Sequence, residues 1–149
     1  MKKLIFVSLL AVTGFTHAVP NVWQSSYAQG FSEYSIQDTK GNTLWVTCND
    51  GAGDDYDHSV RFKTPKKSYE NSDSKYPLTF LLDGKSKVAT SASTKWRNGA
   101  NAWYEFSQGI SKAKKIDVYL NNQKVTTMTP NPNSIKSVAK HIAACSAMF

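Results

Sequence analysis

The sequence predicts an α+β domain, in which two helices pack on a mostly antiparallel, curved β-sheet of about six to seven strands. Short runs that alternate apolar and polar residues recur along the chain, and short turns join most of them, which favours antiparallel pairing. Two later segments instead repeat their apolar residues every three to four positions, which is typical of helices on a core. Cys48 ends one predicted strand, and Cys145 lies on the last predicted helix.

The first eighteen residues have the pattern of a cleaved signal peptide. Lys2 and Lys3 precede an apolar stretch, residues 4–15, which is too short to span a bilayer as a helix. Small residues precede a predicted cut after Ala18, and this order argues against an ordinary buried N-terminal helix. We therefore expect residues 19–149 to form a single exported domain, periplasmic or secreted, and the short lysine-led signal is typical of bacteria.

The charge of the predicted mature domain is moderate. Cleavage removes Lys2 and Lys3 and leaves 16 basic and 11 acidic residues, a net charge of +5. This balance favours acidic partners but equally suits solubility. No later segment is apolar enough to span a membrane, so we expect no stable membrane insertion.

The first elements after the predicted cut are a leader and a hairpin. In residues 19–30, Trp23 and Tyr27 are four positions apart, which fits either one helical turn or an irregular arm across the core. Residues 31–37 and 43–48 alternate, and a glycine-bearing turn joins them, which predicts a β-hairpin.

Further strands are predicted after the hairpin. An acidic loop, residues 49–57, leads to the first of them, and residues 64–75 form a hydrophilic connection without periodicity, which we expect to be mobile. A Pro at the start of a strand and an Asp-Gly turn mark the next pair. The strands expected here are 58–63, 77–82, 85–90, 116–120 and 124–129.

Two helices complete the prediction. The first spans residues 100–115, and lysines at its end complement the helix dipole; its apolar stripe is Trp103, Phe106, Ile110 and Ala113. The second begins after Pro132 with Asn133 or Ser134 as its cap. Its stripe consists of Ile135, Val138, Ile142 and Cys145.

The core-facing stripe of the last helix thus carries a cysteine. Cys145 points at the body of the protein, where the strand ending at Cys48 could meet it, and an exported chain favours the bond. The bond would close a loop of about 100 residues, worth about 4.7 kcal/mol in the chain-entropy model. A bonded pair leaves no thiolate for catalysis.

Catalytic and metal motifs are sparse. The predicted domain holds His58 and His141, but no Gly-x-Ser-x-Gly marks a nucleophile. The densest ligand cluster consists of Asp50, Asp54, Asp55, Asp57 and His58, yet its spacing matches neither a calcium loop nor a zinc site. We predict a solvated acidic loop that contacts a basic partner surface, with no metal and no cofactor. A pair of carboxylates leaves no sequence signature, so a small exported hydrolase stays an alternative.

Nucleic-acid binding is not predicted. Lysines gather with interleaved aromatic residues, which could form a groove for single strands. However, Arg61 and Arg97 are the only arginines, and arginine is the usual contact to phosphates and bases. The lysines are therefore interpreted as a solvated face.

Recognition by surface remains as the class of function. We expect Trp45 and Trp103 in the core, whereas Trp96 lies in a polar stretch between Lys95 and Arg97. Such an aromatic residue is typical of interface anchors, and the alternative is a lid on the core under its own loop.

These observations predict an exported binding protein, most simply an inhibitor or immunity-type protein that recognises another protein. That step is an analogy from size, location and missing catalytic motifs. The alternatives are a secreted accessory or virulence-associated factor that binds an envelope or host component, and the hydrolase.

Overall fold

The computed structural model describes residues 18–147, so the predicted signal peptide lies outside the described residues apart from Ala18. The strands are β1 (Gln24–Ala28), β2 (Phe31–Gln37), β3 (Thr43–Asn49), β4 (Ser59–Lys63), β5 (Ser68–Glu70), β6 (Leu78–Leu82), β7 (Ser86–Ala89), β8 (Ile116–Leu120) and β9 (Gln123–Met128). The helices are α1 (Arg97–Ile110) and α2 (Pro132–Ala144). Within this range, no helix combines the length and apolarity that a membrane crossing requires.

The strands form two antiparallel sheets, with the orders β1-β2-β3-β4-β5 and β7-β6-β8-β9. The α+β class and the antiparallel pairing are thus confirmed. The predicted strands are divided between the two sheets, and two short polar strands, β1 and β5, extend the larger one. β1 lies in the leader, for which the sequence left a helical turn or an irregular arm open, and β5 lies in the connection expected to be mobile.

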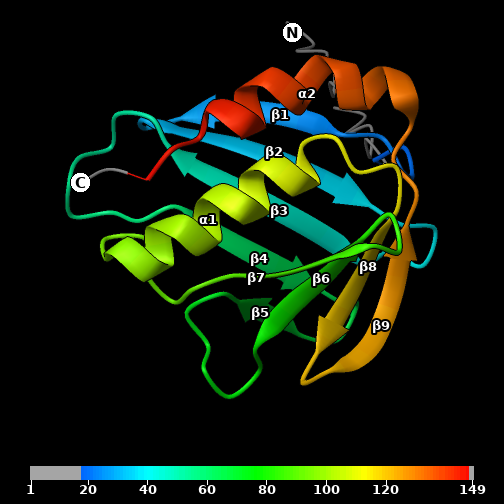
Figure 1. The fold of residues 1–149 in the computed structure, drawn as a ribbon. Coiled ribbons are helices and arrows are strands. Elements are labelled where there is room, and N and C mark those ends of the chain that lie inside the picture. Colours follow the sequence, from blue (N-terminus) through cyan, green and yellow to red (C-terminus); the bar gives the residue numbers. More distant parts are fainter. Residues whose placement is uncertain (1–17, 148–149) are drawn as a thin grey trace, which may run out of the picture.

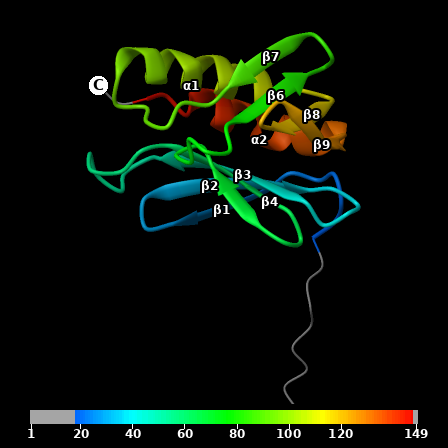
Figure 2. The ribbon, with the colours of Figure 1, turned by 90° about the horizontal axis from the view of Figure 1, so that it is seen from below.

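The molecule has two layers. The five-stranded sheet forms one layer, and the two helices with the four-stranded sheet form the other (Figures 1 and 2). The core fills the space between them and draws side chains from both sheets and both helices. Its largest fully buried side chains include Trp103, Phe62, Phe80 and Phe106.

Strand β3 faces this core with every second residue. Leu44, Val46 and Cys48 are buried, so Trp45 points to the opposite face of the sheet. The prediction that Trp45 lies in the core is therefore wrong. Its ring is half-buried on the outer face, where the guanidinium of Arg61 lies 4.6 Å from the ring centroid.

The disulfide between Cys48 and Cys145 joins this strand to the end of α2. The two Cα atoms are 5.6 Å apart and both side chains are buried. Helix α2 begins earlier than its predicted cap, because Asn131 caps it and accepts a hydrogen bond from the Asn133 N–H. Pro132 then occupies the first helical turn, where a missing N–H is tolerated.

Helix α1 also begins earlier than predicted, at Arg97, and it ends at Ile110. The lysines expected to complement its dipole lie beyond that end, although Ala113 is still buried in the core. The start is fixed by a close approach: a Cβ on Gly99 would lie 1.9 Å from the Ser93 carbonyl oxygen. Only glycine therefore lets the preceding loop pack against the first turn.

A buried carboxylate joins the two sheets. Asp38, in the β2–β3 turn, accepts hydrogen bonds from Asn42 and Lys40 of its own turn and from the Thr126 hydroxyl on β9, at 2.6 Å. Burial alone would raise the pKa of this carboxyl, but the hydrogen bonds hold it below its ordinary value. The seam between the sheets thus depends on an ionised aspartate.

Candidate functional site

The acidic loop, residues 49–57, is held in shape by the amide side chain of its first residue. Asn49 Nδ2 donates to the carbonyls of Gly53 and Tyr56, at 2.8 and 2.9 Å. Asn49 Oδ1 accepts from the N–H groups of Gly51 and Ala52. One buried residue at the end of β3 therefore fixes the path of a loop whose acids Asp54 and Asp55 are exposed.

Asp57 ties the acidic loop to a second loop, residues 91–97, which we call the Trp96 loop. Its Oδ1 accepts from the Thr94 hydroxyl at 2.6 Å and from the Thr94 N–H at 3.2 Å, and its Oδ2 accepts from the Ser93 hydroxyl at 2.8 Å. Burial raises the pKa of Asp57, but these bonds and the charge of Lys95 outweigh burial and lower it. The ionised Asp57 carboxylate thus holds the two loops together through hydrogen bonds.

His58 anchors the acidic loop to the C-terminal segment. Its Nδ1 accepts the Asn49 N–H at 2.9 Å, and its Nε2 lies 2.7 Å from the Ser146 carbonyl oxygen, which can only accept. The ring therefore carries its proton on Nε2. It stacks on Trp103 with ring centroids 5.0 Å apart, and Trp103 in turn donates to the Cys145 carbonyl. Burial lowers the pKa of His58, so the neutral ring is the stable form.

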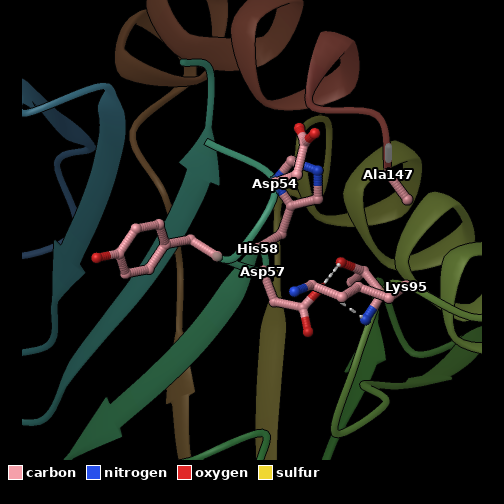
Figure 3. A pocket seen from close by; sticks show the side chains of 7 residues that line it. Asp54, Asp57, His58, Lys95 and Ala147 are labelled. Atoms are coloured by element: carbon pink, nitrogen blue, oxygen red, sulfur yellow. Dashed lines mark hydrogen bonds between the residues drawn. The ribbon is translucent and has the colours of Figure 1, made fainter. Parts of the chain in front are cut away.

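A pocket of about 620 Å³ opens between the two loops and the C-terminal segment. Figure 3 shows it bordered by the side chains of Asp54, Asp57, His58, Lys95 and Ala147. Tyr56 and Thr94 complete the lining. The pocket thus offers acidic, basic and aromatic groups at one opening.

Trp96 lies beside this pocket, at the last position before α1. Its side chain is 75% exposed, which does not fit the alternative of a lid beneath its own loop. Lys95 and Arg97 on either side are also exposed. Tyr56, on the acidic loop, is exposed as well and meets Phe31 edge to face, with ring centroids 5.6 Å apart. The two loops therefore present aromatic rings and both signs of charge to solvent.

We call the acidic loop, the Trp96 loop and the pocket between them the two-loop site. A family model described as YfjT matches residues 21–139 of the chain, a span that includes both loops.

The chain belongs to the YfjT family.

Two similar proteins from Escherichia coli strain K12 are described as uncharacterized proteins. YfjT is 32% identical over 148 residues, which cover 97% of this chain and 95% of YfjT. YkfB is 32% identical over 150 residues, covering 98% of this chain and 96% of YkfB. No solved structure matches the chain.

In this member of the YfjT family, the two predicted recognition regions come together, although they are far apart in the sequence. Asp54, Asp57, His58 and Lys95 line the pocket, whereas Asp55, Trp96 and Arg97 lie outside its lining. Sequence reasoning missed the residues that hold the site, chiefly Asn49, Thr94 and Ser146. For Asn49 a signal existed, since Asn-Asp-Gly predicts a side chain that bonds its own turn.

The geometry restricts the chemistry that the two-loop site of this YfjT-family chain can perform. Both ring nitrogens of His58 and both carboxylate oxygens of Asp57 are engaged within the protein, so neither group is poised to move a substrate proton. Cys48 and Cys145 are bonded to each other. Among residues 18–147, no three His, Cys, Asp or Glu side chains gather in a way that could hold a metal ion. The hydrogen bonds of His58 and Asp57 thus hold the two-loop site together.

Proposed function

We propose that this YfjT-family protein is an exported binding protein of the inhibitor or immunity type, which recognises another protein through the two-loop site. It acts in the periplasm or the medium after cleavage near Ala18. The observation that carries the proposal is the exposure of Trp96 on a loop that the structure holds in place.

Trp96 has the properties of an interface anchor. Tryptophan and arginine are the residues most enriched among those that dominate binding energy, and Arg97 follows it directly. Hydrogen bonds to Asp57 hold Thr94, two residues before Trp96, and the close approach at Gly99 fixes the start of α1 just after it. A partner would therefore lose little free energy in ordering the loop.

The disulfide supports the proposed compartment. Disulfides persist in secreted and periplasmic proteins, whereas the cytosol keeps thiols reduced. The bond lies directly beneath the site, because Cys145 Sγ is 3.5 Å from His58 Nδ1. An oxidising compartment would thus stabilise the two-loop site itself.

The charges of the site indicate the kind of partner surface. Asp54 and Asp55 project from one loop, while Lys95 and Arg97 project from the other. A partner with basic and acidic groups in the reverse order would be steered to it and held in one orientation. The exposed acids favour a basic partner patch against the acidic loop.

Capture with matched variants tests the proposal. The tagged protein is exposed to periplasmic extract and compared with Trp96→Ala and Tyr104→Ala, since Tyr104 is also 61% exposed but lies on the surface of α1. We expect one protein to be held by the wild type and by Tyr104→Ala and to be lost by Trp96→Ala. With the purified partner, calorimetry should give one-to-one binding that Trp96→Ala weakens by about 2 kcal/mol or more, or roughly 30-fold.

Other outcomes would replace the proposal. If Trp96→Ala still captured the partner, the two-loop site would not be the interface. Capture of an envelope glycan or lipid in place of a protein would favour the accessory or virulence-associated alternative. A hydrolytic activity that is lost in Asp54→Asn or Asp55→Asn would favour the hydrolase.

A further inference from the structure

Strand β1 is an open edge of the five-stranded sheet that lacks the usual protection. All five of its residues are exposed, and none is charged or proline. The other three outer strands of the described sheets, β5, β7 and β9, carry Glu70, Lys87 and Lys124. Charged side chains are a common device against edge-to-edge pairing, so β1 is the edge that remains available to another strand.

A hollow lies beside this edge. It measures about 280 Å³ and lies between β1, β2 and the flank of α2. Its lining consists of Ser25, Ser26, Tyr27, Ser32, Tyr34 and His141. Tyr27 lines it from β1 yet is 69% exposed, so its ring lacks a partner that covers it.

We propose that β1 pairs antiparallel with β1 of a second copy, and that the two copies form a symmetric dimer with a continuous ten-stranded sheet. With Ser26 on the two-fold axis, Ser26 faces its own counterpart and each Tyr27 faces the Ser25 of the other copy. The register of β1 with β2 places Ser25 and Tyr27 on the core side, opposite Tyr34 and Ser32. Each Tyr27 ring therefore reaches the hollow of the other copy.

The absence of charged residues from β1 favours a second copy as the occupant. Self-pairing needs a surface that meets itself without like charges, and the sequence Gln-Ser-Ser-Tyr-Ala has none to oppose. Each copy also supplies both parts of the contact: the exposed Tyr27 ring of β1, and the hollow that β1 lines together with β2 and α2. This dimer does not use the two-loop site, so the inference stands apart from the proposed function.

The oligomeric state of the disulfide-bonded domain tests the proposal. Sedimentation equilibrium should show a monomer–dimer equilibrium in the wild type. Because both copies of a symmetric dimer carry each substitution, Tyr27→Ala removes two covered rings from the interface. It should therefore raise the dissociation constant of the dimer by about a hundredfold. Tyr104→Ala, at an exposed aromatic residue outside the edge, should leave it unchanged.

A charge exchange at the axis makes the test specific for β1. Ser26→Lys and Ser26→Glu each place like charges opposite one another in a homodimer, whereas a mixture pairs opposite charges. In native mass spectrometry, the mixed dimer should exceed the one-half share that random pairing gives. Gln123→Lys and Gln123→Glu on β9 should pair at random.

Three results would overturn the inference. The first is a wild type that stays monomeric at every accessible concentration. The second is a dimer that survives Tyr27→Ala unchanged, which would place the interface elsewhere. The third is random mixing of the two Ser26 variants.

Discussion

The carboxylate of Asp57 accepts hydrogen bonds from both the hydroxyl and the N–H of Thr94, 37 positions further along the chain. This contact makes one site out of two loops that the sequence separates. It also makes the site sensitive to a single charge, because a neutral amide offers only one accepting oxygen and Asp57 uses both.

Asp57→Asn should therefore release the Trp96 loop. We expect the free energy of unfolding to fall by about 1–3 kcal/mol, since hydrogen bonds to a charged acceptor are lost. The Thr94 amide should exchange with solvent faster, as measured by hydrogen exchange. Asp55→Asn removes the same charge from the same loop at an exposed position and should change neither quantity. Equal effects of the two variants would contradict the role of Asp57.

His58 should make the fold sensitive to mild acid. Burial lowers its pKa in the folded protein below the ordinary 6.5, while the unfolded chain keeps the ordinary value. The unfolded state thus binds more protons between these two values, and stability falls as the pH drops from about 6.5 towards the folded pKa. Each unit of difference is worth about 1.4 kcal/mol.

Urea unfolding between pH 5 and pH 8 measures this slope. His58→Gln keeps a polar side chain without a titrating ring, and it should flatten the slope in that window. Nitrogen chemical shifts should also show the proton on Nε2 of His58. A slope that is the same in both proteins would show that another group is responsible.

The disulfide should contribute a large share of the stability. Cys48 and Cys145 are 97 positions apart, and removal of a native disulfide from a small exported domain costs about 2–5 kcal/mol. The variant Cys48→Ala/Cys145→Ala should melt at a markedly lower temperature, as should the wild type in reductant. An unchanged melting curve in both cases would refute the structural role of the bond.

Gly30 should be less replaceable than the two glycines of the acidic loop, Gly51 and Gly53. Its φ is +83°, and an added Cβ would lie 2.4 Å from the Ala52 nitrogen, where the β1–β2 turn meets the acidic loop. Gly53 also has a positive φ, +109°, but has open space around it. We expect Gly53→Ala to cost about 1–3 kcal/mol from backbone strain alone, and Gly30→Ala to cost more. Gly51→Ala, which meets no atom within 4 Å, should stay within about 0.5 kcal/mol. Thermal unfolding of the three variants measures these differences. If Gly51→Ala had the lowest melting temperature of the three, the interpretation would be wrong.

Much of the fold could be predicted because periodicity reports burial. The hairpin at residues 31–48 and the periodicity of the last helix led to the correct cysteine pair, although Cys145 lies one residue beyond the end of α2. Strand β1 escaped prediction because its residues are all exposed, so no alternation marks it. Trp45 was misplaced because it looks like a core residue, although the strand that buries Leu44 and Val46 must turn it outward.

The candidate site could be predicted only in parts. The composition marked the acidic loop and the surroundings of Trp96, but their contact depends on how the strands are ordered in space. The hydrogen bond between His58 and Ser146 also had no signal in the sequence. Ser146 lies 88 positions away, and it contributes its backbone carbonyl, which every residue has. Long-range backbone contacts of this kind leave no pattern in a single sequence.

The position of Ala147 has a practical consequence for anyone who handles this protein. It borders the pocket, so a fluorescent label attached at this residue would lie at the rim of the two-loop site. Such a label would shield the surface whose partner it was meant to report. A short tag inserted at Asn121 and Asn122, in the exposed turn of the other sheet, would label the molecule and leave that rim uncovered.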